Sequence, residues 1–201
     1  MAVTGPTAPA EWGEISRAAL AHLAPRAPQA AAAPIADLSQ VLHCEKIVQK
    51  EQAVIHLAFP TVPVTHPDQV ALAILDEALS DLGSRLFIRI REELGLAYFV
   101  GTSQFLGLEA GHFFFYLGTD PAKRREIETE LLSEVAELAD SGLTQQEFLR
   151  AKAKMESQDK LEQQNPSQIA YAAAISLDEV NAIARRYFSN PHYVLAVVSP
   201  Q

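Results

Sequence analysis

The sequence lacks several features that would assign it to a familiar class of protein. It has one cysteine among 201 residues, so it can form neither an internal disulfide nor a cysteine-rich zinc site. It has 16 basic against 25 acidic residues, and a net charge of −9 argues against a nucleic-acid surface. No apolar stretch approaches the roughly 20 residues that span a bilayer, and residues 1–9 do not resemble a signal peptide. The expected location is therefore cytoplasmic.

Catalytic motifs are missing as well. No two of the six histidines lie four positions apart, so the sequence has no HExxH or HxxEH helix that could present two imidazoles to zinc. It also has no phosphate-binding glycine loop and no GxSxG nucleophile elbow. His56 and His112 alternate with apolar residues and are expected to be structural or surface side chains. Cys44 is expected to be a small packed side chain. The sequence therefore predicts no catalytic centre, metal site or cofactor of its own.

What is present is the balance of an ordinary globular protein, with 48% apolar and 20% charged residues. A chain of this length buries roughly 70% of its unfolded surface and can form a core without disulfides or metals. We predict one domain over residues 1–201. Residues 1–24 start it, residues 25–38 form a Pro/Ala-rich connector, and residues 39–201 form the main body.

Periodicity and turn residues predict a mixed order of strands and helices. Strands are expected at residues 2–5, 39–48, 52–59, 97–106, 112–119 and 193–198, and helices at 11–23, 68–79, 85–93, 121–140, 144–163 and 176–187. The runs at 97–106 and 112–119 are predicted to form an antiparallel hairpin. Hairpins mixed with helices favour an α+β domain, an antiparallel-rich mixed sheet covered on one face by helices.

Local signals fix several element boundaries. Asp68 and Ser84 are predicted helix caps, and Pro60 is expected to end a strand. Gly95 is expected just past a helix end, in the left-handed region. Capping boxes are predicted at residues 144–147 and 176–179. The helix after residue 121 should bury an apolar stripe of Ile127, Leu131, Leu132, Val135 and Leu138.

The most specific stretch is Gly83 to Val100, GSRLFIRIREELGLAYFV. It resembles a segment in the second half of the insulinase-like, pitrilysin-like and mitochondrial-processing-type zinc peptidases, where such a run ends a helix and enters a strand. Further similarity to the family extends over residues 51–60, 68–83, 111–121, 142–154 and 176–198. The chain is thereby identified as similar to the C-terminal, non-zinc-binding half of such a clamshell peptidase.

The resemblance implies a function that needs a second half. Arg91 and Tyr98 would reach the active site of an HxxEH-bearing half, which would hold the zinc and lie on the same polypeptide or on a separate subunit. An arginine can clamp substrate carbonyls with five donors, and a tyrosine hydroxyl can donate to a developing oxyanion. The implied ligand is an extended peptide, and a homodimer is also compatible. Arg85 and Arg89 are expected to be surface or interface charges without such a role.

Other interpretations stay open on the residues alone. From its spacing, Arg91 could be a solvated arginine paired with Glu92 or Glu93, and Tyr98 a core aromatic. The chain could instead be a scaffold or assembly subunit that keeps the fold without the chemistry, or a peptide-binding, chaperone-like module. Residues 1–5 resemble the tail of a strand, which favours a piece of a longer protein. The connection at residues 165–176 is shorter than the family's usual helical excursion, either because a loop is deleted or because residues are absent from this chain.

Overall fold

The computed structural model describes residues 9–22, 38–162 and 174–200, and the chain divides into two units, residues 1–34 and 35–201. Each unit is described by itself. The first contains helix α1, Pro9–Leu20, which confirms the helix predicted at residues 11–23 with slightly earlier bounds. The predicted strand at residues 2–5, the Pro/Ala-rich segment 25–34 and most of the shortened connection at 165–176 lie outside the described residues. The prediction of a single domain over 1–201 stays a prediction.

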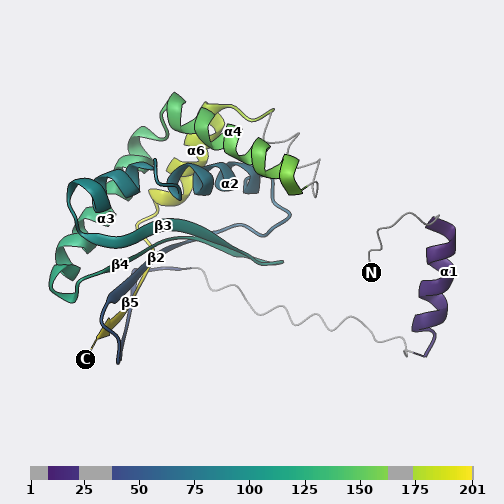
Figure 1. Cartoon of the computed structure of the whole chain (residues 1–201), viewed down its shortest axis with the longest axis horizontal. Helices are drawn as coiled ribbons and strands as arrows, with labels where there is room; N and C mark the ends of the chain where they lie inside the picture. Colours follow the sequence, from purple (N-terminus) through teal and green to yellow (C-terminus); the bar gives the residue numbers. More distant parts are fainter. Residues whose placement is uncertain (1–8, 23–37, 163–173, 201) are drawn as a thin grey trace. The chain divides into compact units, whose positions relative to one another are not determined.

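The second unit is built on a five-stranded mixed sheet (Figure 1). The spatial order is β1-β5-β2-β4-β3, in which only β1 and β5 are parallel and the other three neighbouring pairs are antiparallel. This confirms the predicted antiparallel-rich sheet and the hairpin of β3 and β4. The strands are β1 Leu42–Val48, β2 Ala53–Thr61, β3 Ala97–Leu106, β4 Gly111–Thr119 and β5 Val194–Pro200.

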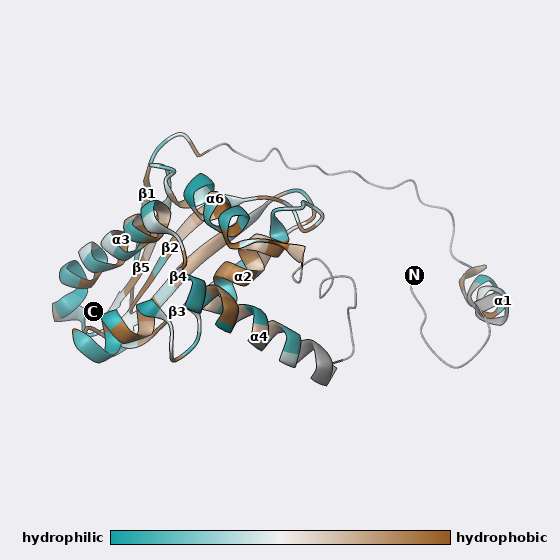
Figure 2. Cartoon of the chain, turned by 90° about the horizontal axis from the view of Figure 1, so that it is seen from above, coloured by the Kyte–Doolittle hydropathy of each residue, from teal (hydrophilic) through white to brown (hydrophobic). Residues whose placement is uncertain are grey.

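The helices of this unit lie on one face of the sheet (Figure 1), as predicted. The alternation of buried and exposed residues along β2 and β4 follows from this arrangement, because successive side chains of a strand point to opposite faces. Figure 2 shows the apolar ribbon of β2 and β4 beneath the helices. The helical elements are α2 Gln69–Leu79, η1 Phe87–Glu93, η2 Pro121–Lys123, α3 Arg124–Ser141, α4 Gln145–Glu162 and α6 Leu177–Phe188.

Aromatic rings from separate elements form the centre of the core. Phe59 of β2 and Phe113 and Phe115 of β4 are buried, and all three contact the ring of Phe188 from α6 at centroid distances of 5.0–5.5 Å. Such tilted and edge-on contacts add to the free energy of burial. Of the stripe predicted for α3, four residues are buried and Leu132 is half-buried at the edge of the core.

Both predicted capping boxes are confirmed. Thr144 and Glu147 exchange hydrogen bonds at the start of α4, and Ser176 and Glu179 do so at the start of α6. Asp68 is at the N-cap position of α2, as predicted, but the expected cap bond from its side chain is absent. Its carboxylate instead accepts hydrogen bonds from Arg186 and Tyr187 of α6, at 2.9 and 2.7 Å.

The prediction that Pro60 ends its strand is also wrong, since β2 continues to Thr61. The reason lies in the pairing. β5 pairs with β2 only as far as Ala58, so one side of β2 has no strand partner at Pro60. A residue without an N–H loses no ladder hydrogen bond there.

The face of the sheet opposite the helices carries exposed and half-buried side chains. His56 stacks on Phe114, and His112 stacks on Phe105, at centroid distances of 5.3 and 5.1 Å. Both histidines thus lie on the surface among aromatic rings, where burial lowers their pKa below the ordinary value. Cys44 was expected to be packed, but it is exposed because β1 is an edge strand. That prediction is wrong.

Candidate substrate-contacting site

The segment that carries the predicted site residues is a wide helical turn followed by a sharp exit. A helix at residues 85–93 was predicted, but residues 87–93 adopt the π-helical form, in which the Leu94 N–H donates to the Arg89 carbonyl, five residues back, at 3.1 Å. π-Helical turns are rare and occur often at functional sites. Gly95 then adopts φ 59°, as predicted, and lets the chain turn toward β3.

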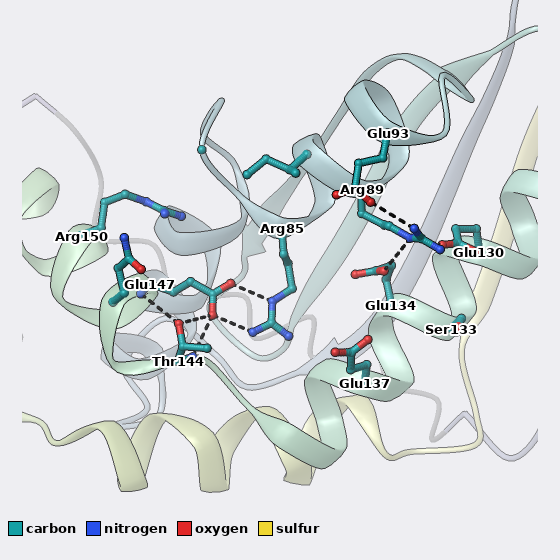
Figure 3. Close-up of a pocket in the computed structure, with 13 residues that line it drawn as sticks. Arg85, Arg89, Glu93, Glu130, Ser133, Glu134, Glu137, Thr144, Glu147 and Arg150 are labelled. Atoms are coloured by element: carbon teal, nitrogen blue, oxygen red, sulfur yellow. Dashed lines mark hydrogen bonds and ion pairs between the residues drawn. The ribbon is translucent and has the colours of Figure 1, made fainter.

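Arg85 anchors the start of this segment to the first turn of α4 and to the residues just before it. Its guanidinium donates to both carboxylate oxygens of Glu147, at 2.8 and 2.6 Å (Figure 3). It also donates to the Gly142 carbonyl at 2.9 Å. Only 17% of its side chain is exposed. The expectation that Arg85 is a surface or interface charge is therefore wrong, because bidentate pairing lets a charge be buried.

The carboxylate of Glu147 shows how strong this pairing is. Burial alone would raise its pKa, but the hydrogen bonds from Arg85 and Thr144 outweigh burial and lower the pKa from 4.5 to about 2. Glu147 was predicted only as the last residue of a capping box. Its second role, holding an arginine 62 residues earlier in the chain, left no local signal in the sequence.

Arg89 lies one turn further along and remains a surface residue, as predicted. It donates to Glu130 at 2.8 Å and to Glu93 at 3.1 Å, and 45% of its side chain is exposed. These residues line a polar pocket of about 680 Å³ together with Arg85, Glu134 and Glu147 (Figure 3). Burial and the neighbouring carboxylates of Glu137 and Glu130 raise the pKa of Glu134, and its 4.0 Å ion pair with Arg89 opposes this only in part. The charged side chains that line this pocket are thus largely paired with one another.

Arg91 lies outside that pocket and is far less engaged. Among the described residues, its one ion pair is a 3.9 Å approach to the neighbouring Glu92, and its guanidinium lies over the Phe87 ring at 4.8 Å. The side chain is 42% exposed. Sequence spacing left open that Arg91 is a solvated arginine paired with Glu92, and the structure contains this ion pair. Because the ion pair is long and exposed, it holds the guanidinium weakly.

Tyr98 lies at the entrance of β3, where the register of the β3–β4 ladder shifts between Ala97 and Phe99. Such a bulge redirects a side chain, and Tyr98 is 53% exposed rather than part of the core. In the described part of the chain its hydroxyl has no hydrogen-bond partner, and neither a hydrogen bond nor a cation–π contact joins Tyr98 to Arg91. The two predicted site residues are thus both exposed at the surface and are not bonded to each other.

The arrangement of possible metal-donor side chains offers no metal site in the part of the chain that the structure describes. Among residues 9–22, 38–162 and 174–200, no three histidine, cysteine, aspartate or glutamate side chains are placed to hold a metal ion. These residues do not fit the zinc that the resemblance assigns to the other half. Within the same ranges, no helix is both long and apolar enough to cross a membrane.

Comparison with solved structures defines the class of the fold. The chain matches the crystal structure of a protease from Helicobacter pylori with a TM-score of 0.82 at 16% identity, over 98% of this chain and 54% of that chain. It matches the inactive peptidase domain from Bordetella parapertussis with a TM-score of 0.64 at 16% identity, over 75% of this chain and 94% of that one. At these identities the likeness shows the fold alone, which is that of a peptidase half.

The family follows from sequence. The profile of the peptidase M16 inactive domain matches residues 2–155, and the chain belongs to this family. It is also 27% identical over 183 residues to the uncharacterized zinc protease YmxG of Bacillus subtilis, covering 79% of this chain and 44% of that protein. The chain thus spans less than half the length of this curated relative. The resemblance inferred from residues 83–100 is confirmed.

Proposed function

We propose that this chain is the substrate-binding, non-catalytic half of a zinc peptidase, and that it completes the active site of an HxxEH-bearing partner half through Arg91 and Tyr98. The ligand is an extended peptide. The partner would hold the zinc and supply the hydrolytic chemistry. This chain's own residues would bind and orient the peptide.

The availability of Arg91 and Tyr98 carries the proposal. Arg85 and Arg89 of the same segment are held by carboxylates at 2.6–3.1 Å, whereas the carboxylate that Arg91 approaches in the part of the chain that the structure describes, Glu92, is 3.9 Å away. A guanidinium in this condition can exchange a weak partner for a peptide carbonyl or carboxylate at little energetic cost. The remaining residues of the segment fix its backbone, so the arginine is presented from a rigid support.

Tyr98 complements the arginine. The bulge leaves the apolar ring of Tyr98 partly exposed to water, which is unfavourable. Its hydroxyl is free, however, to donate to a charge that develops on a substrate oxygen. A free donor is most useful when the partner half closes over the site and excludes water, because hydrogen bonds to charge strengthen there. The two side chains would then act on different parts of one bound peptide.

A reconstitution assay tests this function. The chain alone, the HxxEH-bearing half alone and an equimolar mixture are assayed with a quenched fluorescent peptide, with and without a metal chelator. We expect hydrolysis in the mixture at a rate well above that of either half, and its loss with chelator. Stable association of the halves without any hydrolysis would contradict the proposal.

The second candidate is a scaffold or assembly subunit. It is favoured by the sheet face opposite the helices, where aromatic side chains such as Phe99 and Phe105 are exposed. Exposed apolar patches commonly mark protein–protein contacts. A scaffold would bind its partner through this face and tolerate loss of both Arg91 and Tyr98, which the peptidase would not.

A further inference from the structure

The outer side of β3 is an edge of the sheet, and its main-chain groups are only partly used. β3 pairs with β4 on one side alone. At Thr102 the outward N–H and C=O are both bonded to the Ser80 hydroxyl at the end of α2, at 3.2 and 2.9 Å. The end of α2 therefore covers the edge of β3 at this residue.

The edge is open two and four residues later. Main-chain groups along an antiparallel strand alternate in direction, so the N–H and C=O groups of Gln104 and Leu106 point to the same side as those of Thr102. In the described part of the chain these groups have no hydrogen-bond partner. Edge groups of this kind are a template for an added strand.

A pocket of about 390 Å³ lies beside this open edge. Gln104 and Leu106 line it from β3, and apolar side chains of other elements complete it, including Val64, Val70 and Met155. Its volume falls within the range of pockets that hold small ligands, and it has room for one bulky side chain.

The walls of the pocket are fixed before any ligand binds. The Gln69 amide donates to the Val62 carbonyl at 2.7 Å and ties the loop after β2 to the start of α2. The Val64 N–H donates to the Gly107 carbonyl at 2.9 Å and ties the same loop to the β3–β4 hairpin. A preformed pocket lowers the ordering cost of binding.

The Gln104 side chain adds a second sign of an absent ligand. Its Oε1 is buried, and it has no hydrogen-bond partner in the described part of the chain. Buried acceptors without partners are uncommon in folded proteins and call for an explanation. The unpaired oxygen belongs to a residue that both lines the pocket and offers free main-chain groups.

We propose that the open edge of β3 at Gln104 and Leu106, together with this pocket, is a subsite that pairs with a short extended peptide and takes one of its bulky apolar side chains. The proposal rests on the proposed function in that the ligand is a peptide. The added segment is short because α2 covers the edge at Thr102. Its main chain pairs with Gln104 and Leu106, and the side chain that points to the helical face enters the pocket.

Peptide titration of the full chain, followed by NMR, tests the subsite without the partner half. The probe is the capped peptide Thr-Gln-Thr-Leu-Thr-Gln-Thr, and its control has aspartate in place of leucine. We expect saturable shifts at the Gln104 and Leu106 amides, and binding weakened about tenfold or more by the aspartate. Equal binding of both peptides, or shifts confined to other surfaces, would overturn the proposal.

Variants of the chain separate the pocket from general effects. Leu106→Asp at the exposed rim and Ala73→Phe in the wall should each weaken binding about tenfold. The first replaces apolar surface with a charge, and the second fills the pocket. Leu108→Asp at the hairpin tip and Ala153→Phe on the exposed side of α4 are the matched controls and should bind as the unchanged chain does. Loss of binding in the controls as well would contradict the assignment.

Hydrogen exchange of the free chain tests the edge itself. The Gln104 and Leu106 amides should exchange fast and the Ser103 and Phe105 amides slowly, because the latter face β4. Slow exchange at Gln104 and Leu106 would mean that another part of the chain already covers the edge, and would contradict the proposed subsite. This binding is measured on the chain alone, whereas hydrolysis needs the HxxEH-bearing half. Failure of reconstituted hydrolysis and failure of this binding are therefore separate results.

Discussion

Arg85 and Arg91 lie six residues apart in one helical segment, yet the fold uses them in opposite ways. Arg85 is 17% exposed and holds Glu147 and the Gly142 carbonyl at 2.6–2.9 Å, whereas Arg91 is 42% exposed and approaches Glu92 at 3.9 Å. The exposure and the contacts of these two arginines thus differ because different residues surround them in the fold. Arg85 meets a carboxylate already fixed by the α4 capping box, whereas within the described ranges Arg91 meets Glu92, the Phe87 ring and solvent.

Gly142→Ala should have the largest effect, because it disturbs the Arg85 region at its backbone. Gly142 has φ 72° and ψ −164°, a region open to glycine alone. A Cβ there would also overlap the Asn181 amide, which cannot move without breaking its two bonds to Leu143. We expect the free energy of unfolding to fall by about 4 kcal/mol, measured in urea.

Gly95→Ala is the matched change on the Arg91 side. Gly95 has φ 59°, but a Cβ there would meet no atom within 4 Å. We expect a loss of only about 1–2 kcal/mol, from the left-handed conformation alone. Equal losses at Gly142 and Gly95 would show that the two regions are equally rigid and would break the comparison.

Arg85→Met should cost about 3 kcal/mol of unfolding free energy, because it leaves the buried Glu147 carboxylate without its main partner. Arg91→Met should cost less than about 0.5 kcal/mol, since its ion pair is long and exposed. Urea denaturation of both variants measures the difference. A large loss at Arg91 would mean that it, too, is structural.

Acid should weaken the Arg85 region through Glu147. Its pKa falls from 4.5 to about 2 on folding, so the folded state favours the ionised carboxylate. The resulting stability, about 2–3 kcal/mol, is fully present above pH 4.5 and is lost as the pH falls toward 2. Glu147→Gln should be less stable at pH 7 and show a flatter stability profile between pH 4.5 and 2. Parallel profiles for the two proteins would refute the assignment.

Tyr98→Phe should have the smallest effect and act on function alone. The Tyr98 hydroxyl has no hydrogen-bond partner in the described part of the chain, and phenylalanine keeps the ring, so the melting temperature should stay the same. In the reconstituted peptidase we expect kcat/KM to fall about tenfold, because one donor to the transition state is lost. A drop in melting temperature of several degrees would instead identify Tyr98 as a packing residue.

Much of the fold could be predicted because local signals and tertiary structure agree. The hairpin of β3 and β4, both capping boxes and the turn at Gly95 depend on neighbouring residues, and all are confirmed. Predictions failed where a distant partner decides the outcome. Asp68 is drawn to α6 instead of capping α2, and Pro60 is tolerated because β5 stops pairing at Ala58.

The site shows the same limit. Spacing alone made Arg91 a solvated residue and Tyr98 a core aromatic, and only the resemblance singled them out. The bulge at Tyr98 depends on the pairing of β3 with β4, and the pairing of Arg85 with Glu147 spans 62 residues. Periodicity within a short window carries no information on such contacts.

The most direct test of the difference between Arg85 and Arg91 is the kcat/KM of the reconstituted peptidase carrying Arg91→Ala, read beside its melting temperature. We predict a loss of about 100-fold in kcat/KM with an unchanged melting temperature, and partial recovery with Arg91→Lys, which keeps the charge but not the five donors. Unchanged kcat/KM with Arg91→Ala would contradict the account and leave the chain as a scaffold.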